Sequence, residues 1–226
     1  MFIGHYGLGF MIKRKFSEIP LWILFLCVQF MDIVAFILVF FGVEKAVYQN
    51  SDNPFLTNHL DLPYSHSLVG ALLLSVLVYL IFIVIRRRSW ALIAALCVLS
   101  HWVIDFVVHT PDLSIFFGHI HAGCGLWNYP YLSFGLEIIL ALSGWLILRY
   151  RNTVSVLLLF LLVGSFTGMI FGKEPDVVKN NEALRTSMVL AVDMLFIVLA
   201  YFSEKIQKTS AAEHAVHPIA RRARSG

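Results

Sequence analysis

The sequence predicts an all-α membrane protein, a polytopic bundle of about six transmembrane helices preceded by a short N-terminal segment that is interfacial or re-entrant. Hydrophobic residues make up 59% of the 226-residue chain and charged residues only 14%, with a mean hydropathy of +0.79. A soluble domain would carry roughly a quarter charged residues. The apolar residues form long uninterrupted stretches, and the basic residues gather in alternate loops.

Six apolar stretches approach or exceed the roughly 20 residues needed to span a bilayer. They lie at about 21–43, 66–85, 90–109, 131–149, 153–172 and 186–203. The first is too long for the core of a signal peptide and no small-residue cleavage site follows it, so we expect it to be retained. We predict one transmembrane domain over residues 1–204, followed by a basic, disordered cytoplasmic tail over residues 205–226.

The distribution of Lys and Arg predicts the orientation of the helices. Alternate crossings place thirteen of the 17 basic residues on one side, including the KRK run at 13–15, the RRR run at 86–88 and the tail. The other side holds the remaining four, which are Lys45, Lys173, Lys179 and Arg185. We therefore expect both termini in the cytoplasm and the loops 44–65, 110–130 and 173–185 on the outer side.

The stretch SHWVIDFVVHTPD, residues 100–112, places ionisable side chains in an otherwise apolar segment. His101, Asp105 and His109 recur every four residues, so they share one face of a helix, and Asp112 follows them. Histidine nitrogens and carboxylate oxygens are the usual ligands of zinc and similar divalent metals. Because the outer two residues of this stripe lie about 12 Å apart along the axis, they cannot share one ion without other helices. The stripe predicts one ion with a second-shell partner, or two neighbouring ions.

Other ionisable residues of the spans are expected at the same depth as this stripe. In the predicted orientation, Asp32, His66 and Glu137 lie with it between the midplane and the outer surface. Charged groups inside a bilayer are costly and usually face a site or the protein interior. Scattered structural residues have no reason to share a depth, so we predict one polar site that opens outward. Asp193 has no histidine nearby in sequence, and we expect it to pair with a neighbouring helix.

Three further histidines have more open interpretations. His119 and His121 alternate in the outer loop 110–130, where they could reach a metal or form a solvated pair. The apolar segment before the KRK run could rise about 12–15 Å from the inner surface, which would bring His5 toward Asp32.

The three cysteines have no metal-ligand spacing and suggest no disulfide framework; they are Cys27, Cys97 and Cys124.

Several short motifs follow one another in an order and spacing that can be compared with known families. They are GHYGLG with His5, FMDIV with Asp32, PYSHSL with His66 and Ser67, LSHWVIDFVVHTPD with His101 and Asp105, and GLWNYPYLSFGLE with Trp127 and Glu137. In order and spacing, roughly residues 1–140 resemble the YdjM-like membrane-bound metal-dependent hydrolases of the bacterial inner membrane. The chain departs from that family where LDLPYSHS replaces the pattern HRGxTHS. Asp61 therefore stands where the family has a histidine, and we expect it to cap or orient the helix that begins near His66.

The resemblance implies a multi-pass protein of the bacterial inner (cytoplasmic) membrane. The family is distantly similar to the helical zinc-dependent phospholipase C and P1-type nuclease group, which implies phosphoester hydrolysis by analogy. We therefore expect an enzyme that acts on an ester or phosphoester of a lipid or other amphiphile, through a metal-activated water. No nucleic-acid partner is expected.

The expected site combines metal ligands with a catalytic carboxylate. The predicted ligands of a divalent ion, with Zn²⁺ as the expected metal, are His66, His101, Asp105 and His5. Further candidate ligands are His109, Asp112, Asp61, His119 and His121. The predicted catalytic carboxylates are Glu137 and Asp32, one of them as general base.

Three rival functions would use the same residues differently. A small proton- or metal-ion-coupled transporter could relay charge through the aligned Asp, Glu and His groups, but transporters often show inverted repeats and broken helices, and no repeat is visible in this sequence. A two-iron membrane oxygenase would need about eight histidines, and the tail holds two of the nine in this chain. A structural protein would use the polar residues only to lock the bundle.

Overall fold

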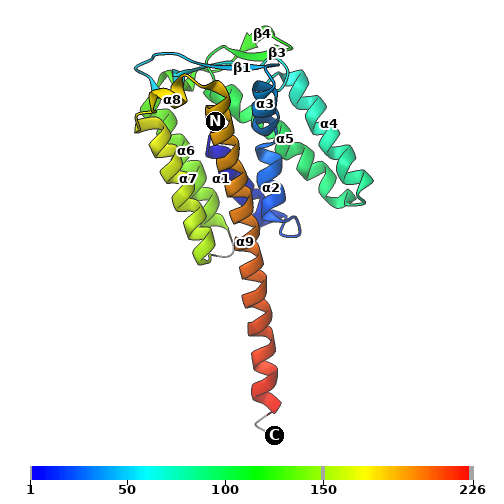
Figure 1. Ribbon diagram of the computed structural model, residues 1–226. Coiled ribbons are helices and arrows are strands. Elements are labelled where there is room, and N and C mark those ends of the chain that lie inside the picture. The colour runs from blue at the N-terminus through cyan, green and yellow to red at the C-terminus, as the bar shows by residue number, and fades with distance from the viewer. Residues whose placement is uncertain (1, 149–150, 224–226) are drawn as a thin grey trace.

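The structure, a computed structural model, describes residues 2–148 and 151–223 and shows a bundle of helices with two short β-hairpins at one end (Figure 1). The helices are α1 (Gly4–Lys15), α2 (Leu21–Val28), α3 (Phe30–Phe40), α4 (Leu68–Val84), α5 (Arg88–Val108), α6 (Pro130–Ile147), α7 (Thr153–Phe171), α8 (Asp176–Lys179) and α9 (Glu182–Ala223). The strands are β1 (Lys45–Tyr48), β2 (Asn58–Asp61), β3 (Leu113–Phe116) and β4 (His119–Ala122). Residues 149–150, in and just after the span expected over 131–149, and residues 224–226 of the expected tail lie outside the described residues.

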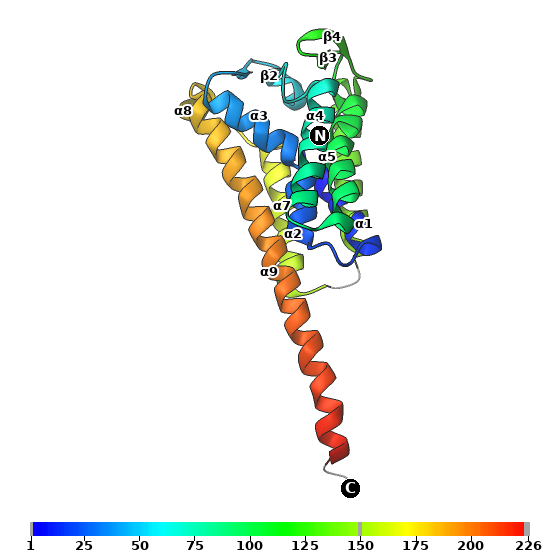
Figure 2. The same cartoon turned by 90° about the vertical axis from the view of Figure 1, so that its right-hand side faces the viewer.

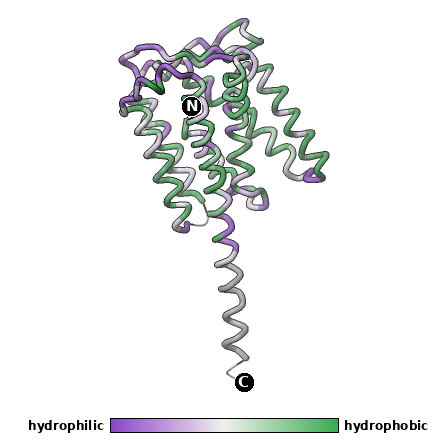
Figure 3. The backbone as a smooth tube through the Cα atoms, in the orientation of Figure 1, coloured by the Kyte–Doolittle hydropathy of each residue, from purple (hydrophilic) through white to green (hydrophobic). Residues whose placement is uncertain are grey.

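Long apolar helices dominate the bundle. Four helices of the described chain are long and apolar enough to cross a membrane, namely α5, α6, α7 and the part of α9 from Glu182 to Ser210. In Figure 3 the apolar helical segments lie between two hydrophilic ends, one formed by the hairpins and α8 and the other by the turns at the opposite end. The predicted helical class is confirmed, and these helices indicate a multi-pass membrane protein.

Two of the predicted spans differ from simple crossing helices. The stretch expected over 21–43 forms two helices, α2 and α3, which are bent by 54° at a break and are long enough to cross only as a pair. Helix α4 has 17 residues, fewer than the span expected over 66–85. The six predicted spans therefore correspond to four full-length helices, one broken pair and one short helix. No glycine or proline lies at the break, where Gln29 joins the two helices.

Helix α9 continues well past the span expected over 186–203. It runs as one helix to Ala223 and extends beyond the rest of the bundle (Figure 2). The tail expected over residues 205–226 is therefore helical as far as Ala223, and the domain boundary at residue 204 remains a prediction. The helical continuation fits the sequence EKIQKTSAAEHA, which is rich in good helix formers.

The N-terminal segment forms a helix that is enclosed by the others. Helix α1 begins in the middle of the bundle and ends with the KRK run at the end opposite the hairpins (Figures 1 and 2). Its Tyr6 and Phe10 are fully buried. Gly7 approaches the backbone of α6 at Leu140, and Gly144 of α6 faces Gly7, so closely that a Cβ on either glycine would collide with backbone atoms. Small residues at such a crossing let two helices pack backbone to backbone.

A buried ion pair fixes the other end of α1. Lys13 donates to Glu204 of α9 at 3.0 Å and also to the carbonyls of Ser17 and Ile19. The second oxygen of Glu204 accepts from the backbone N–H of Leu21, the first residue of α2. This set of contacts, here called the inner ion pair, joins α1, the following turn and α9 at the end of the bundle away from the hairpins.

Candidate metal centre

Two histidines and an aspartate from helices α1 and α5 meet in the interior. The Nε2 atom of His5 lies 3.2 Å from Asp105 Oδ1, and the Nε2 atom of His101 lies 3.2 Å from Asp105 Oδ2. The rings of His5 and His101 stack with their centroids 3.7 Å apart. Both rings are fully buried. The re-entrant position expected for the N-terminal segment thus brings His5 into contact with the histidine stripe.

A second group overlaps the first. Asp32, in the first turn of α3, lies 3.1 Å from His66 Nε2 and 3.5 Å from His101 Nε2 through its Oδ1. His66 precedes α4, whose start is capped by the Ser67 hydroxyl accepting from Gly70 N–H. The cap holds His66 at the end of the helix nearest the hairpins. Five side chains therefore converge, here called the His/Asp cluster: His5, Asp32, His66, His101 and Asp105.

The break between α2 and α3 orients His101. In a continuous helix the carbonyl of Val28 would accept from the backbone N–H four residues later. Here it lies 2.6 Å from His101 Nδ1. Because a carbonyl only accepts, Nδ1 is the protonated nitrogen that donates. In neutral His101 the lone pair is then on Nε2, the nitrogen that faces Asp32 and Asp105.

The tautomer of His66 is also fixed by its neighbours. The Ser65 hydroxyl donates to Glu44 Oε2 at 2.6 Å, and His66 Nδ1 lies 3.0 Å from the same hydroxyl oxygen. Since the hydroxyl proton is used on Glu44, the oxygen accepts from Nδ1–H of His66. The Glu44 carboxylate also accepts from the backbone N–H of Tyr64 and Ser65. Glu44 and Ser65 are not among the residues predicted from the sequence, although Ser65 stands directly before His66.

His109 extends the cluster toward the hairpins. Its Nε2 lies 3.8 Å from Asp105 Oδ2 and its Nδ1 lies 3.0 Å from Asp112 Oδ1. Burial lowers the pKa of His109, and the hydrogen bond with Asp112 opposes this only in part. Burial alone would raise the pKa of Asp112, but the hydrogen bond with His109 and the charge interactions between them bring it below its usual value. An ionised Asp112 thus accepts from Nδ1–H of a neutral His109, as in carboxylate–histidine–metal arrangements.

With these tautomers, the acceptor nitrogens of the histidines face the acceptor oxygens of the aspartates. The Nε2 lone pairs of neutral His66, His101 and His109 all face the carboxylate oxygens of Asp32 or Asp105. Although His101 Nε2 is fully buried and near both carboxylates, it makes no hydrogen bond in the described structure. Such a cluster needs cations between its members, either protons on the rings or a metal ion. Histidine with carboxylate is a donor set that suits zinc.

The spacing of the donor atoms fits an ion. His5, His101 and Asp105 each offer a ligand atom within 4.8 Å of the others, and so do Asp32, His66 and His101. The two groups share His101, which places two candidate positions side by side. The described structure thus contains a buried group of histidines and aspartates that could hold a divalent metal.

Glu137, expected as a catalytic carboxylate, has another partner here. Its Oε1 accepts from Phe2 N–H, and its Oε2 accepts from the N–H groups of Phe2 and Gly4, all at 2.9–3.0 Å. These amides have no acceptor within the helix because they lie at the start of α1, directly before His5, and a carboxylate is well suited to this position. Glu137 therefore holds the end of the helix that presents His5, and its role as a base remains a prediction.

The remaining candidates lie outside the cluster. Asp193 of α9 accepts from the Tyr6 hydroxyl at 2.6 Å and from Gln29 at 3.4 Å, which agrees with the expected contact to neighbouring helices. His119 and His121 are exposed on β4. Asp61 ends β2 instead of capping α4, because Ser67 provides that cap. His121 and Asp61 line a cavity beside the cluster, which also reaches His66 and His109.

Comparison with known proteins adds no relative: no family model, curated protein or solved structure matches this chain. The resemblance to the YdjM-like hydrolases therefore remains a prediction that rests on the short motifs quoted above. What can be stated directly is a mostly helical chain with long apolar helices and a buried His/Asp cluster suited to a metal ion.

Proposed function

We propose that this protein is a membrane-embedded metal-dependent hydrolase. Its His/Asp cluster would hold one or two divalent ions, with zinc as the expected metal, and its substrate would be an ester or phosphoester of a lipid or other amphiphile. The observation that supports this most directly is the arrangement of tautomers. Three histidines donate through Nδ1 to groups outside the cluster and turn Nε2 toward two carboxylates, which is the arrangement that metal-binding histidines adopt.

The residues of the chain divide into ligands and supports. His5, His66, His101 and Asp105 would bind the ion, and His109 is close enough to join them. Their orientation is fixed by the Val28 carbonyl, by Ser65 with Glu44, and by Asp112. A bound divalent ion supplies a water of lowered pKa and polarises the substrate oxygen.

Asp32 is the better placed of the two predicted catalytic carboxylates. It lies in the cluster, and a fifth of its side chain is exposed, whereas Asp105 is almost fully enclosed. Glu137, in contrast, has both oxygens engaged by backbone N–H groups. We therefore assign to Asp32 the acceptance of a proton from the attacking water, a role that contributes about 10²–10⁴ to the rates of enzymes that use it.

The position of the cluster supports an amphiphilic substrate. The cluster lies where α3 and α4 begin and α5 ends, next to the hairpins and within a bundle of apolar helices. In the orientation predicted from the basic residues, this is the outer half of the membrane. A scissile ester near a lipid headgroup lies at a comparable depth.

One observation favours a second candidate function, a proton- or metal-ion-coupled transporter. The pair α2–α3 is bent by 54° at the position where its backbone contacts the cluster. Broken helices whose free carbonyls face an ion site are a feature of secondary transporters. The same lone-pair arrangement could then hold protons that move. Transport would require a gradient-dependent flux in proteoliposomes, which a hydrolase does not need.

The deciding experiment measures metal content in the detergent-purified protein by mass spectrometry. Wild type should hold about one or two equivalents of zinc or another divalent metal, and His101→Ala and Asp105→Ala should each lose it. His119→Ala, a control for an exposed histidine of β4, should retain it. Release of product from lipid ester or phosphoester should follow the metal. A well-folded wild type that takes up no metal even when zinc is added would contradict the proposal.

A further inference from the structure

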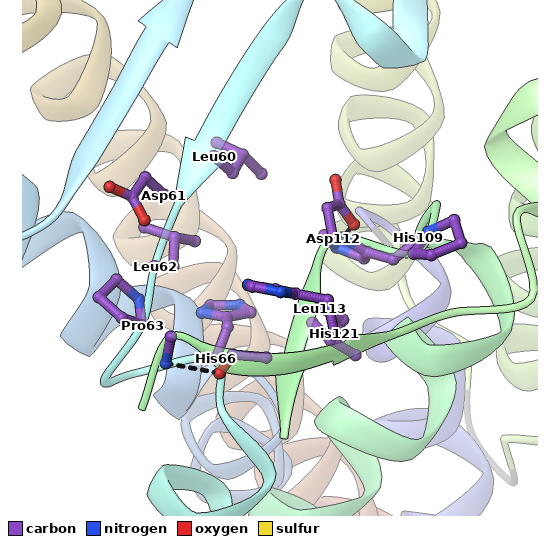
Figure 4. A pocket seen from close by; sticks show the side chains of 12 residues that line it. Leu60, Asp61, Leu62, Pro63, His66, His109, Asp112, Leu113 and His121 are labelled. Carbon is purple, nitrogen blue, oxygen red and sulfur yellow. Dashed lines mark hydrogen bonds and ion pairs between the residues drawn. The ribbon is translucent and has the colours of Figure 1, made fainter. Parts of the chain in front are cut away.

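The cavity beside the His/Asp cluster has a composition that can select substrates. It holds about 300 Å³ and lies between the two hairpins, at the end of the bundle where α4 begins and α5 ends. In Figure 4, Asp61 from β2 and Asp112 from the segment after α5 lie on either side of His66. This volume is at the lower end of the range for small-molecule sites, and it suits a polar head group better than an acyl chain.

The cavity communicates with the proposed ligands. Its lining includes His66 and His109, which are only 4% and 5% exposed and whose Nε2 atoms face Asp32 and Asp105. The His101 nitrogen that makes no hydrogen bond belongs to the same cluster. A substrate whose reacting bond reached the cluster through this cavity would leave its adjoining polar group between Asp61 and Asp112.

The charge of the lining is unlike that of a phosphate-binding site. Among the described residues that line the cavity, Asp61 and Asp112 are the charged ones, and there is no lysine or arginine. Lys45 lies opposite Asp61 in the register of β1 and β2 but does not line the cavity. Sites for anionic head groups use Arg or Lys to bind them. Two carboxylates in a partly enclosed space instead attract a cation and repel an anion.

We propose that this cavity binds a positively charged group of the substrate, of the alkylammonium class found in ethanolamine head groups. The word substrate rests on the proposed hydrolase function, but binding to the cavity can be measured whether or not the protein hydrolyses the bound molecule. Asp61 and Asp112 would contact the ammonium group, while the reacting bond lies at the His/Asp cluster. A substrate with an uncharged polyol in place of the ammonium group would lose these contacts.

The test compares two short-chain probes with the same acyl chains, dihexanoyl phosphatidylethanolamine and dihexanoyl phosphatidylglycerol. Their binding to the purified protein in a nonionic detergent, both without and with added zinc, is measured by calorimetry below the concentration at which the probes form micelles. We expect the ethanolamine probe to bind about tenfold more tightly, which corresponds to a difference of about 1.4 kcal/mol in binding free energy at about 25 °C. Asp61→Asn should bring the ratio of the two dissociation constants to within about threefold of one. Asp112→Asn should do the same, with metal content measured alongside.

A matched control is Asp176→Asn, a highly exposed carboxylate of α8 at the same end of the bundle that does not line the cavity. It should leave the ratio unchanged. Equal binding of the two probes, or tighter binding of the glycerol probe, would overturn the inference. An equal loss of preference in Asp61→Asn and Asp176→Asn would do so as well, because it would indicate a general surface charge effect.

Turnover is followed separately, so that the two proposals can fail independently. Tight binding of the ethanolamine probe, with no release of fatty acid or phosphoester product from either probe, would support the cation-binding cavity and count against hydrolysis of these lipids. Hydrolysis of both probes with equal affinity would support the metal-dependent hydrolase and overturn the cation-binding cavity.

Discussion

Two buried groups of ionisable residues hold opposite ends of helix α1, and they are built differently. At the inner ion pair, Lys13 donates to Glu204 and to two carbonyls, and Glu204 also accepts from a backbone N–H and from Lys208. In this group each hydrogen-bond donor has an acceptor. In the His/Asp cluster, histidine lone pairs face carboxylates, and buried nitrogens of His5 and His101 make no hydrogen bond in the described structure.

The difference predicts a structural role for the inner ion pair and a metal-dependent role for the His/Asp cluster. A buried pair in which every donor has an acceptor stabilises one conformation and needs nothing more. A buried group of unmatched acceptors costs free energy until a cation is added. Changes in the inner ion pair should therefore lower stability without changing metal content. In the His/Asp cluster, stability should depend on bound metal.

Breaking the inner ion pair should have the largest effect on stability. Lys13→Met leaves Glu204 buried, and we expect a loss of about 3 kcal/mol in the free energy of unfolding, the low end for a broken buried pair because Lys208 remains. Metal content should not change. Denaturant titration in detergent measures the first and mass spectrometry the second. The matched control is Lys208→Met, which removes the exposed partner of Glu204 and should cost less than about 1 kcal/mol.

Metal removal should destabilise the wild type almost as much. With free zinc at a hundred times its dissociation constant, bound metal adds about 2.7 kcal/mol of stability, which a chelator would remove. His101→Ala should show no difference in thermal stability with and without chelator, while Lys13→Met should keep the wild-type difference. Equal chelator sensitivity in wild type and His101→Ala would mean that the stabilising ion binds elsewhere.

Glu137→Gln distinguishes a supporting carboxylate from a general base. The amide nitrogen of Gln cannot accept the N–H groups of Phe2 and Gly4, so the start of α1 and His5 should shift. We expect zinc affinity to fall about 10–100-fold, as when groups that orient metal ligands are removed. If Glu137 instead acts as the base, metal affinity would stay at the wild-type value and turnover alone would drop.

Removing the Ser65 hydroxyl should give the smallest measurable effect. Ser65→Ala leaves His66 Nδ1 without its acceptor, so zinc affinity should decrease about tenfold, at the low end for such changes. Ser75→Ala is the control, because Ser75 is also buried but lies within α4 and donates to the carbonyl of Ala71 in the same helix. Competition with a fluorescent zinc chelator measures both affinities. If the two variants had the same zinc affinity, Ser65 would have no part in orienting a metal ligand.

The parts of the fold that the sequence predicts are those set by local composition. Apolar runs locate the long helices, and the spacing of His101, Asp105 and His109 places them on one face of α5. The N-terminal segment is too short to span and was expected to be interfacial or re-entrant, with His5 able to approach Asp32; the structure brings His5 into the cluster.

What escaped prediction depends on contacts between distant segments. The segment LCVQFMDIV contains no glycine or proline, so the break at Gln29 has no local signal; it accompanies the hydrogen bond between His101 and the Val28 carbonyl. Glu44 reaches Ser65 from 21 residues away, across the first hairpin. Glu137 was predicted as a catalytic carboxylate of a span, but its partners follow from how α1 enters the bundle.

The packing of α1 also sets an order of events during synthesis. The partners of its first residues come late in the chain: Asp105 lies 100 residues beyond His5, Glu137 lies 133 beyond Gly4, and Asp193 lies 187 beyond Tyr6. The segment that the ribosome makes first must therefore wait for α9 before all its contacts exist. Such long-range closure is slow compared with local helix formation. The five residues of the His/Asp cluster have all been made by residue 105, but the contacts of α1 that hold His5 among them are complete only when α6 and α9 have joined the bundle.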